Sequence, residues 1–392
     1  MNKVLMLLQS EFPPDIRLEK EIKSFSNGGF DVTLLCNQYN KEKNSEYPGV
    51  TLFRIPAVSG NIKINKLLNF PLFANPRFLW YAIKAIKKFK PDFLHVHDLP
   101  MAPLGWFLNK LFGIPTILDL HEVYPEALKS FNKKGLINFI FKNYRLARIL
   151  EKWIVHKFDK LVVVVEESKS RLVKMGVPAE KVHVVSNTVD LDTFDISENF
   201  REIDLEGNPV LIYSGLVGPD KGLDTPVRGM KYLREYYPEA KLYILGEGPD
   251  KPRIEKIIAD ENISGTQFLP WQGHEIIPSY LNASDICIMV WPSNSFTDTT
   301  IPHKLFEYMS QGKKVIVSDA KPLKRIIDET GAGEVFKSNN PQSFADTIKL
   351  LYESDKNYGQ NGIKAVQNKY NWRVDSEELL NLYNELKERS KK

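Results

Sequence analysis

The sequence predicts an α/β protein made of two Rossmann-like, doubly wound domains that face each other across a cleft. Short apolar segments alternate with longer amphipathic ones along the whole chain, which is typical of stacked βαβ units with parallel sheets. Residues 161–165 are apolar on both faces, as in a strand that helices cover on each side. With 392 residues, the chain is long enough for two hydrophobic cores.

The first half of the chain contains seven expected strands and a first helix with clear boundaries. Pro13-Pro14-Asp15 opens this helix and Gly28-Gly29 ends it, because proline suits a first helical turn and glycine suits a helix end. Leu18, Ile22 and Phe25 recur on one face and predict the side that packs on the sheet. The strands are expected at residues 4–8, 31–36, 51–56, 93–96, 116–120, 160–165 and 182–186.

The polar, acidic stretch 190–209 has no strong period and is predicted to link the domains, which are therefore expected at residues 1–190 and 191–372. A second strand–helix series follows the linker. Its strands are expected at residues 210–214, 241–245, 266–269, 286–289 and 314–317, and its helices at 222–235, 275–281 and 303–311. The last helix is expected at residues 374–389, where apolar side chains recur at helical spacing, namely Leu379, Leu382, Tyr383 and Leu386.

The positive charge of the chain is concentrated in its first half. Residues 1–200 carry 28 Lys and Arg against 21 Asp and Glu, a net charge of +7, whereas the remainder carries 25 against 28, a net charge of −3. The stretches 61–90 and 129–160 are both basic and contain several aromatic residues. Such a surface suits an anionic membrane or an acidic substrate. The alternative is a solvated helix face with core aromatic residues behind it.

Several localisations are disfavoured by the composition. The apolar run at residues 4–8 is too short for the core of a signal peptide, and no run approaches the roughly 20 residues that span a bilayer. The two cysteines, Cys36 and Cys287, lie far apart in strand-like segments, so a disulfide framework is not expected. We therefore expect a cytoplasmic protein that can lie peripherally on the inner face of a membrane.

Three segments contain residues suited to binding a nucleotide. In residues 213–224, glycines and Lys221 precede a helix, which suits a diphosphate, although a plain turn has the same features. Gly246-Glu247-Gly248 follows an expected strand, where a ligand or merely another loop can approach. In residues 301–317, a proline opens a short helix whose amides can bind phosphate and whose Glu307 can accept hydrogen bonds from a ribose diol, unless Glu307 is an ordinary exposed charge.

The order of several motifs resembles the family 4 glycosyltransferases of GT-B fold. Pro302-x-Lys304-Leu305-Phe306-Glu307 with Gly312 and a following apolar strand is similar to the donor-binding motif of that family. The other similar segments, in chain order, are Gly29–Thr33, His95–Asp98, Asp119–Glu126 of the H-E-x-x-P-E type, Val185–Asp190, Lys221–Leu223 and Gly246–Gly248. The resemblance covers nearly the whole chain.

The resemblance implies that the second domain holds a nucleotide-sugar donor. Lys221 would bind the diphosphate, Glu307 the ribose, and amides near His303 a phosphate. The donor-binding residues implied in this way are Gly215, Lys221, Gly246, Glu247, Asp298, Thr299, His303, Lys304, Leu305 and Glu307.

The resemblance also implies that the first domain contacts the transferred sugar and the acceptor. His121 would reach toward the transferred sugar, and the last helix, residues 373–392, would cross back to this domain. The implied catalytic residues are His121, Lys221 and Glu307, and the implied acceptor-side residues are His97, Asp98 and Glu122.

Neither a metal nor another cofactor is expected. Asp190-Leu191-Asp192 falls in the hinge-like segment, where it is interpreted as a turn. His95 and His97 would lie on one strand face, but the sequence spacing supplies no third ligand. Two positions depart from the family pattern, since Leu216 stands where an arginine is frequent and Thr299, beside Asp298, where a glutamate is frequent.

The function expected from this resemblance is transfer of a sugar from a nucleotide-sugar donor, with retention of configuration. The basic first half favours a lipid-linked or cell-surface glycan acceptor, as in polysaccharide or lipopolysaccharide assembly. A nucleic-acid partner is not expected. The alternatives are a sugar-nucleotide epimerase of the same fold and a catalytically silent nucleotide-sugar-binding module, which the departures at Leu216 and Thr299 would suit. A Rossmann oxidoreductase is disfavoured, because no glycine fingerprint follows residues 4–8.

Overall fold

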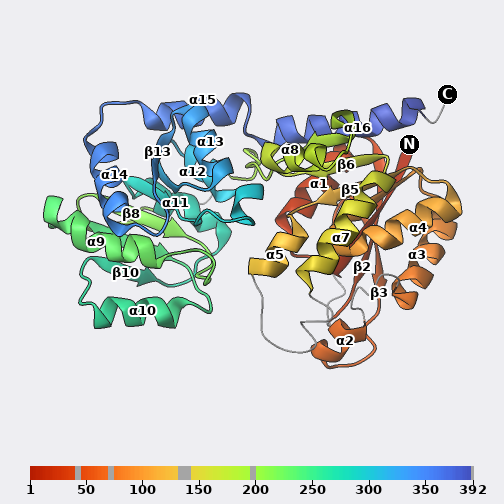
Figure 1. The fold of residues 1–392 in the computed structure, drawn as a ribbon, viewed down its shortest axis with the longest axis horizontal. Helices are drawn as coiled ribbons and strands as arrows, with labels where there is room; N and C mark the ends of the chain where they lie inside the picture. The colour runs from red at the N-terminus through yellow and green to blue at the C-terminus, as the bar shows by residue number, and fades with distance from the viewer. Residues whose placement is uncertain (40–45, 69–74, 131–142, 195–199, 390–392) are drawn as a thin grey trace. The chain divides into compact units, whose positions relative to one another are not determined.

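In the computed structural model, which describes residues 1–39, 46–68, 75–130, 143–194 and 200–389, the chain forms two compact α/β units (Figure 1). Unit 1 contains residues 1–186 and 375–392, and unit 2 contains residues 187–374. Parts of the two basic stretches, residues 69–74 and 131–142, lie outside the described residues. Two separate parallel sheets confirm the prediction of two doubly wound domains.

Unit 1 is built on a seven-stranded parallel sheet of order β3-β2-β1-β4-β5-β6-β7. Its strands are β1 (Asn2–Glu11), β2 (Phe30–Asn37), β3 (Thr51–Ile55), β4 (Phe93–His97), β5 (Thr116–Leu120), β6 (Lys160–Val163) and β7 (Val182–Val184). The strand order reverses between β1 and β4. In this topology, ligands bind beyond the carboxyl ends of the strands at such a reversal.

The helices of unit 1 are α1 (Ile16–Asn27), α2 (Ile62–Leu68), α3 (Pro76–Phe89), α4 (Ala102–Phe112), α5 (Tyr124–Ser130), α7 (Tyr144–Ile154) and α8 (Glu166–Lys174), followed at the chain end by α16 (Trp372–Arg389). The expected limits of α1 are confirmed, because the Asp15 carboxylate accepts a hydrogen bond from the Leu18 amide and Gly28 caps the other end. Helix α16 joins this unit, where the Tyr383 ring packs against Phe25 and Phe93.

Unit 2 is built on a six-stranded parallel sheet of order β10-β9-β8-β11-β12-β13, which reverses between β8 and β11. Its strands are β8 (Val210–Ser214), β9 (Lys241–Leu245), β10 (Thr266–Leu269), β11 (Ile286–Met289), β12 (Lys314–Ser318) and β13 (Gly333–Phe336). Its helices are α9 (Asp224–Tyr236), α10 (Lys251–Asp260), α11 (Ile277–Asn282), α12 (Lys304–Ser310), α13 (Lys321–Thr330), α14 (Pro341–Glu353) and α15 (Tyr358–Asn368). Strand β13 was not among the expected strands.

The boundary between the two units lies four residues before the predicted one at residue 190. The chain leaves unit 1 after Ser186, and residues 187–194 already belong to unit 2. Val189 forms a β-bridge with Asn371, and Phe194 is buried. The polar composition of this segment concealed these contacts, because a single bridge leaves no periodic pattern.

Two glycine-containing loops of unit 2 are stacked backbone against backbone. The Gly215 amide donates a hydrogen bond to the Leu245 carbonyl at 2.9 Å, and the Val217 amide donates to the Glu247 carbonyl at 2.9 Å. A Cβ atom on Gly246 would lie 1.9 Å from the Gly215 carbonyl oxygen. Gly246 is therefore required by the packing of these loops, whether or not a ligand also contacts it.

We predict that Gly246→Ala lowers the free energy of unfolding by roughly 1–3 kcal/mol, because the added methyl group must displace a hydrogen-bonded backbone segment. The matched control is Gly60→Ala, where a Cβ atom meets nothing within 4 Å. Urea unfolding of both variants checks this, and an unchanged midpoint for Gly246→Ala would contradict the stacking of the two loops.

Candidate active site

The first candidate cluster lies in unit 2 beyond the carboxyl end of β8, where the strand order reverses. The Ser214 amide donates a hydrogen bond to the Tyr308 hydroxyl oxygen at 3.1 Å, and the two hydroxyl groups lie 3.0 Å apart. These contacts fix helix α12 against the end of β8. The first turn of α12 therefore lies beside the glycine-rich loop that begins at Gly215.

The ammonium group of Lys304 lies directly against Gly215. A Cβ atom on Gly215 would come within 1.5 Å of Lys304 Nζ, and the Gly215 φ of +139° also favours glycine. Burial and the nearby charge of Lys221 lower the pKa of Lys304 to about 8, against the opposing effect of Glu307. A bound anion would stabilise the charged ammonium, so this geometry suits a phosphate group.

Lys221 supplies a second cation near Lys304. Its Nζ atom donates a hydrogen bond to Asp220 Oδ2 at 2.5 Å and lies 4.9 Å from the centre of the Trp291 ring. The positive charge of Lys221 contributes to lowering the pKa of Lys304, because the two ammonium groups repel one another. Together they can balance the charge of a diphosphate.

Glu307 is a buried, ionised carboxylate in the same helix as Lys304. Its side chain is 5% exposed, and its Oε1 atom accepts a hydrogen bond from His274 Nε2 at 3.0 Å and lies 3.6 Å from His303 Nε2. Burial by itself would raise the pKa of Glu307, but the hydrogen bond from His274 and the nearby cationic groups lower it overall. The hydrogen bond to Glu307 in turn raises the pKa of His274.

His274 was not predicted from the sequence. Its only sequence signal is its position shortly after β10. The contact with Glu307 joins residues 33 positions apart, so no local motif could indicate it.

The other predicted donor-site residues have partners of their own in unit 2. Asp298 accepts hydrogen bonds from the Lys321 amide at 3.1 Å and from the Ser293 hydroxyl at 2.9 Å, which attaches it to the first residue of α13. The Thr299 hydroxyl donates to the Phe296 carbonyl at 2.9 Å. The Glu247 carboxylate pairs with Lys251, and the Leu305 side chain is buried in the core.

The second candidate cluster lies in unit 1 at the carboxyl ends of β4 and β5. Asp98 has a φ of +66°, which is uncommon for a residue other than glycine and is typical of functional sites. Its amide donates to the Asp119 carbonyl at 2.8 Å, and its Oδ1 atom accepts from the His121 amide at 3.2 Å. Glu122, the residue after His121, lines a small pocket together with Arg171.

His121 is an imidazolium at neutral pH. Burial would lower its pKa, but the carboxylates of Asp98 and Asp119 outweigh burial and raise the pKa to about 10. Burial lowers the pKa of His97 well below its ordinary value, so His97 is neutral. We therefore assign the 3.1 Å contact between them as a hydrogen bond that His121 Nε2 donates to His97 Nδ1.

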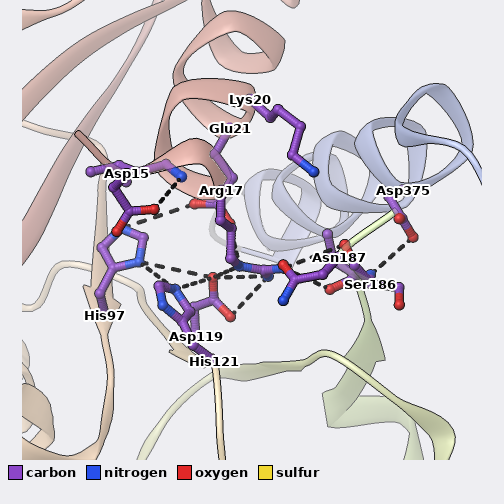
Figure 2. A network of polar contacts seen from close by, with 12 residues as sticks. Asp15, Arg17, Lys20, Glu21, His97, Asp119, His121, Ser186, Asn187 and Asp375 are labelled. Carbon is purple, nitrogen blue, oxygen red and sulfur yellow. Dashed lines mark hydrogen bonds and ion pairs between the residues drawn. The ribbon is translucent and has the colours of Figure 1, made fainter. Parts of the chain in front are cut away.

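Figure 2 shows Arg17 at the centre of this network. Its Nη2 atom donates to the Asp119 carboxylate at 3.1 and 3.2 Å, its Nε atom lies 3.0 Å from Glu21 Oε1, and its Nη1 atom donates to the Val185 carbonyl at 3.0 Å. The sequence prediction missed this arginine. The signal was an Arg–Glu pair four positions apart beside the apolar face of the first helix.

Among the residues that the structure describes, two groups of side chains have a spacing that a metal ion could use. One contains Glu21, His95, His97 and Asp119, and the other contains His274, His303 and Glu307. The sequence offered no third ligand beside the H-x-H pair, but the fold brings two carboxylates there. In that group, the Arg17 guanidinium already binds both carboxylates.

Two family profiles match the chain. One, described as Glycosyl transferases group 1, matches residues 195–367, and the other, described as Glycosyltransferase Family 4, matches residues 20–193. The colanic acid biosynthesis glycosyl transferase WcaI of Escherichia coli K12 is 26% identical over 265 residues, covering 65% of this chain and 63% of WcaI. The matched part thus spans less than two thirds of that relative.

A second relative and a solved structure are similar over most of the chain. An Escherichia coli UDP-Gal:alpha-D-GlcNAc-diphosphoundecaprenol alpha-1,3-galactosyltransferase is 24% identical, covering 84% of this chain and 82% of its own. The crystal structure of HepE from Anabaena in complex with UDP and glucose superposes with a TM-score of 0.67 and 14% identity, covering 98% of this chain and all of HepE.

We predict that Asp98→Asn lowers the pKa of His121, because a neutral amide no longer stabilises the imidazolium. A raised pKa contributes stability that is complete below the unfolded-state pKa and is lost as pH rises through about 10, so the variant should lose stability at pH 8. NMR titration of the histidine ring nitrogens measures the pKa directly. Asp31→Asn, on β2, is the control, and an unchanged His121 pKa in Asp98→Asn would refute the assignment.

Proposed function

This chain belongs to the family 4 glycosyltransferases of GT-B fold, and we propose that it transfers a sugar from a nucleoside-diphosphate donor to a lipid-linked or cell-surface glycan acceptor, with retention of configuration. The observation that carries this proposal is the arrangement of Lys304 and Lys221 at the glycine-rich loop, with the ionised Glu307 in the same helix as Lys304.

The donor is assigned to unit 2, with one chemical role for each group. The two ammonium groups bind the diphosphate, and Glu307 accepts hydrogen bonds from the ribose diol while His274 and His303 hold its carboxylate in place. A uridine nucleotide is the first candidate, because HepE was crystallised with UDP and the galactosyltransferase relative is named for a UDP-sugar.

Stabilisation of the departing diphosphate is the main catalytic contribution that we assign to the protein. The bond between the anomeric carbon and the diphosphate breaks, and negative charge develops on the oxygens that Lys304 and Lys221 hold. These two ammonium groups supply the positive charge that the reaction requires, so we propose transfer without a metal. His121, as an imidazolium, can donate a hydrogen bond from Nδ1 to a bound sugar but cannot act as a base.

The acceptor is proposed to be lipid-linked and presented at the inner face of a membrane. The galactosyltransferase relative is named for a diphosphoundecaprenol-linked acceptor. The positive charge of unit 1 would favour an acidic acceptor of this class. No helix in the described ranges is long and apolar enough to cross a bilayer, and a cytoplasmic location stays a prediction.

The function is tested by incubating the protein with UDP-sugars and a polyprenyl-diphosphate-linked sugar, with product analysis by mass spectrometry and NMR. A product with the donor's anomeric configuration supports the proposal. Conversion of the UDP-sugar without acceptor would identify an epimerase instead. Binding of UDP-sugars without turnover of any acceptor would identify a silent binding module.

We predict that the affinity for UDP falls about fourfold between pH 7.0 and 8.5, because above its pKa Lys304 must take up a proton to bind the diphosphate. Lys304→Met should bind UDP more weakly and lose most of this pH dependence. Lys324→Met, an exposed lysine on α13, should retain it. Calorimetric titration at both pH values provides the measurement, and equal pH dependence in wild type and Lys304→Met would contradict the assignment.

We also predict that Glu307 discriminates nucleotides by their ribose hydroxyls. Hydrogen bonds to a charged group contribute about 1.5–3 kcal/mol, so the wild type should prefer UDP over 2′,3′-dideoxy-UDP by roughly tenfold or more. Glu307→Ala should bind both nucleotides with similar affinity. A preference that persists in Glu307→Ala would show that the diol is bound elsewhere.

A further inference from the structure

Helices α3, α4 and α7 of unit 1 carry a cluster of solvent-exposed large apolar side chains. Six of these are between 45% and 67% exposed: Trp80, Phe107, Leu111, Leu146, Ile149 and Trp153. We call this the α3–α4–α7 face. The three helices are joined there, because the Trp106 and Trp153 rings lie 5.0 Å apart and one pocket is lined from all three helices.

The orientation of α7 shows that its apolar stripe faces outward. Ala147, Glu151 and Ile154 form its buried face, whereas Leu146, Ile149 and Trp153 are exposed at helical spacing. Glu151, its only acidic residue, is buried and paired with Arg171. A surface helix normally buries its apolar stripe, so this arrangement indicates an apolar partner outside unit 1.

The centre of the α3–α4–α7 face is an apolar pocket of about 270 Å³. All of its lining residues are apolar or aromatic, among them Leu79, Pro103, Phe107, Leu150 and Trp153. No charged side chain in the described part of the chain lines it, so it suits a hydrocarbon chain better than a headgroup or a sugar.

The charge of these three helices is complementary to that of an anionic bilayer. The three helices contain eight lysines and arginines, and Glu151, which is buried, is their only acidic residue. Lys84 Nζ lies 5.2 Å from the Trp80 ring, and Lys157 Nζ lies 5.8 Å from the Trp153 ring. Tryptophan flanked by lysine is typical of the interface between headgroups and acyl chains. A second copy of the chain would instead bring like charges together.

We propose that the α3–α4–α7 face docks on an anionic lipid bilayer, with Phe107, Ile149 and Trp153 inserted below the headgroups and one lipid hydrocarbon chain in the pocket. This rests on the proposed function, since a lipid-linked acceptor is found at such a surface. The lysines and arginines of the three helices bind the anionic headgroups, and the apolar side chains leave water.

Flotation of the full chain with vesicles of phosphatidylcholine and phosphatidylglycerol tests the docking. Wild type should float with these vesicles and far less with phosphatidylcholine alone, and 0.5 M salt should weaken binding. Ile149→Glu should reduce the bound fraction at least tenfold. The control is Leu350→Glu, at a leucine of unit 2 that is 58% exposed against 67% for Ile149, and this variant should float as wild type. Absent wild-type binding, or unchanged binding of Ile149→Glu, would overturn the proposal.

Acyl-chain bromolipids test the pocket, because bromine quenches tryptophan fluorescence only at short range. Quenching should occur in wild type and fall in Trp153→Phe, whereas unchanged quenching in that variant would overturn the pocket assignment.

UDP titration of Ile149→Glu separates the two proposals: normal UDP affinity with lost flotation confirms that the face acts apart from the donor site. Sedimentation measures whether the wild type is a dimer. If the wild type is a dimer that does not bind vesicles, and Ile149→Glu is a monomer, the partner of this face is a second copy of the chain and the proposal is overturned.

Discussion

Both candidate clusters depend on one topological constraint, the reversal of strand order in each parallel sheet. In unit 1 the reversal lies between β1 and β4, and in unit 2 between β8 and β11. Connections leave such a point toward opposite faces of the sheet, so the carboxyl ends of the two strands stay uncovered. The chain places Arg17 and His97 at the first reversal and Gly215 at the second. In each unit, the position of the candidate cluster is therefore set by the strand order of the sheet.

The two clusters compensate their charges in different ways. In unit 1, the Arg17 guanidinium binds Asp119, lies beside Glu21 and holds the Val185 carbonyl, so one buried cation orders α1, β5 and the last residues before the chain leaves the unit. In unit 2, burial beside a second ammonium group lowers the pKa of Lys304, which leaves its charge under-compensated. A bound diphosphate would relieve that imbalance, whereas in unit 1 the charge of Asp119 is already paired with that of Arg17.

The sequence predicted the strands flanking each reversal and the elements carrying Lys221, Glu307 and His121, because glycines, prolines and local motifs mark these positions. It did not predict the contact of Lys304 with Gly215, the hydrogen bond from His274 to Glu307, or Arg17, because each joins segments far apart in the chain. The bridge between Val189 and Asn371, which also joins distant segments, was not predicted either. Gly246 was predicted to bind the donor, and the stacking of the two loops is enough to explain a glycine at that position.

The central claim, that the donor nucleotide binds unit 2, is tested most directly by hydrogen exchange of the full chain with and without saturating UDP. Slower exchange in residues 214–218 and 303–307, where the glycine-rich loop meets α12, is the result that we predict. The corresponding peptides of Lys304→Met should show less protection at the same nucleotide concentration. Protection confined to residues 95–122 of unit 1, or none in unit 2 despite demonstrated UDP binding, would contradict the assignment of the donor site.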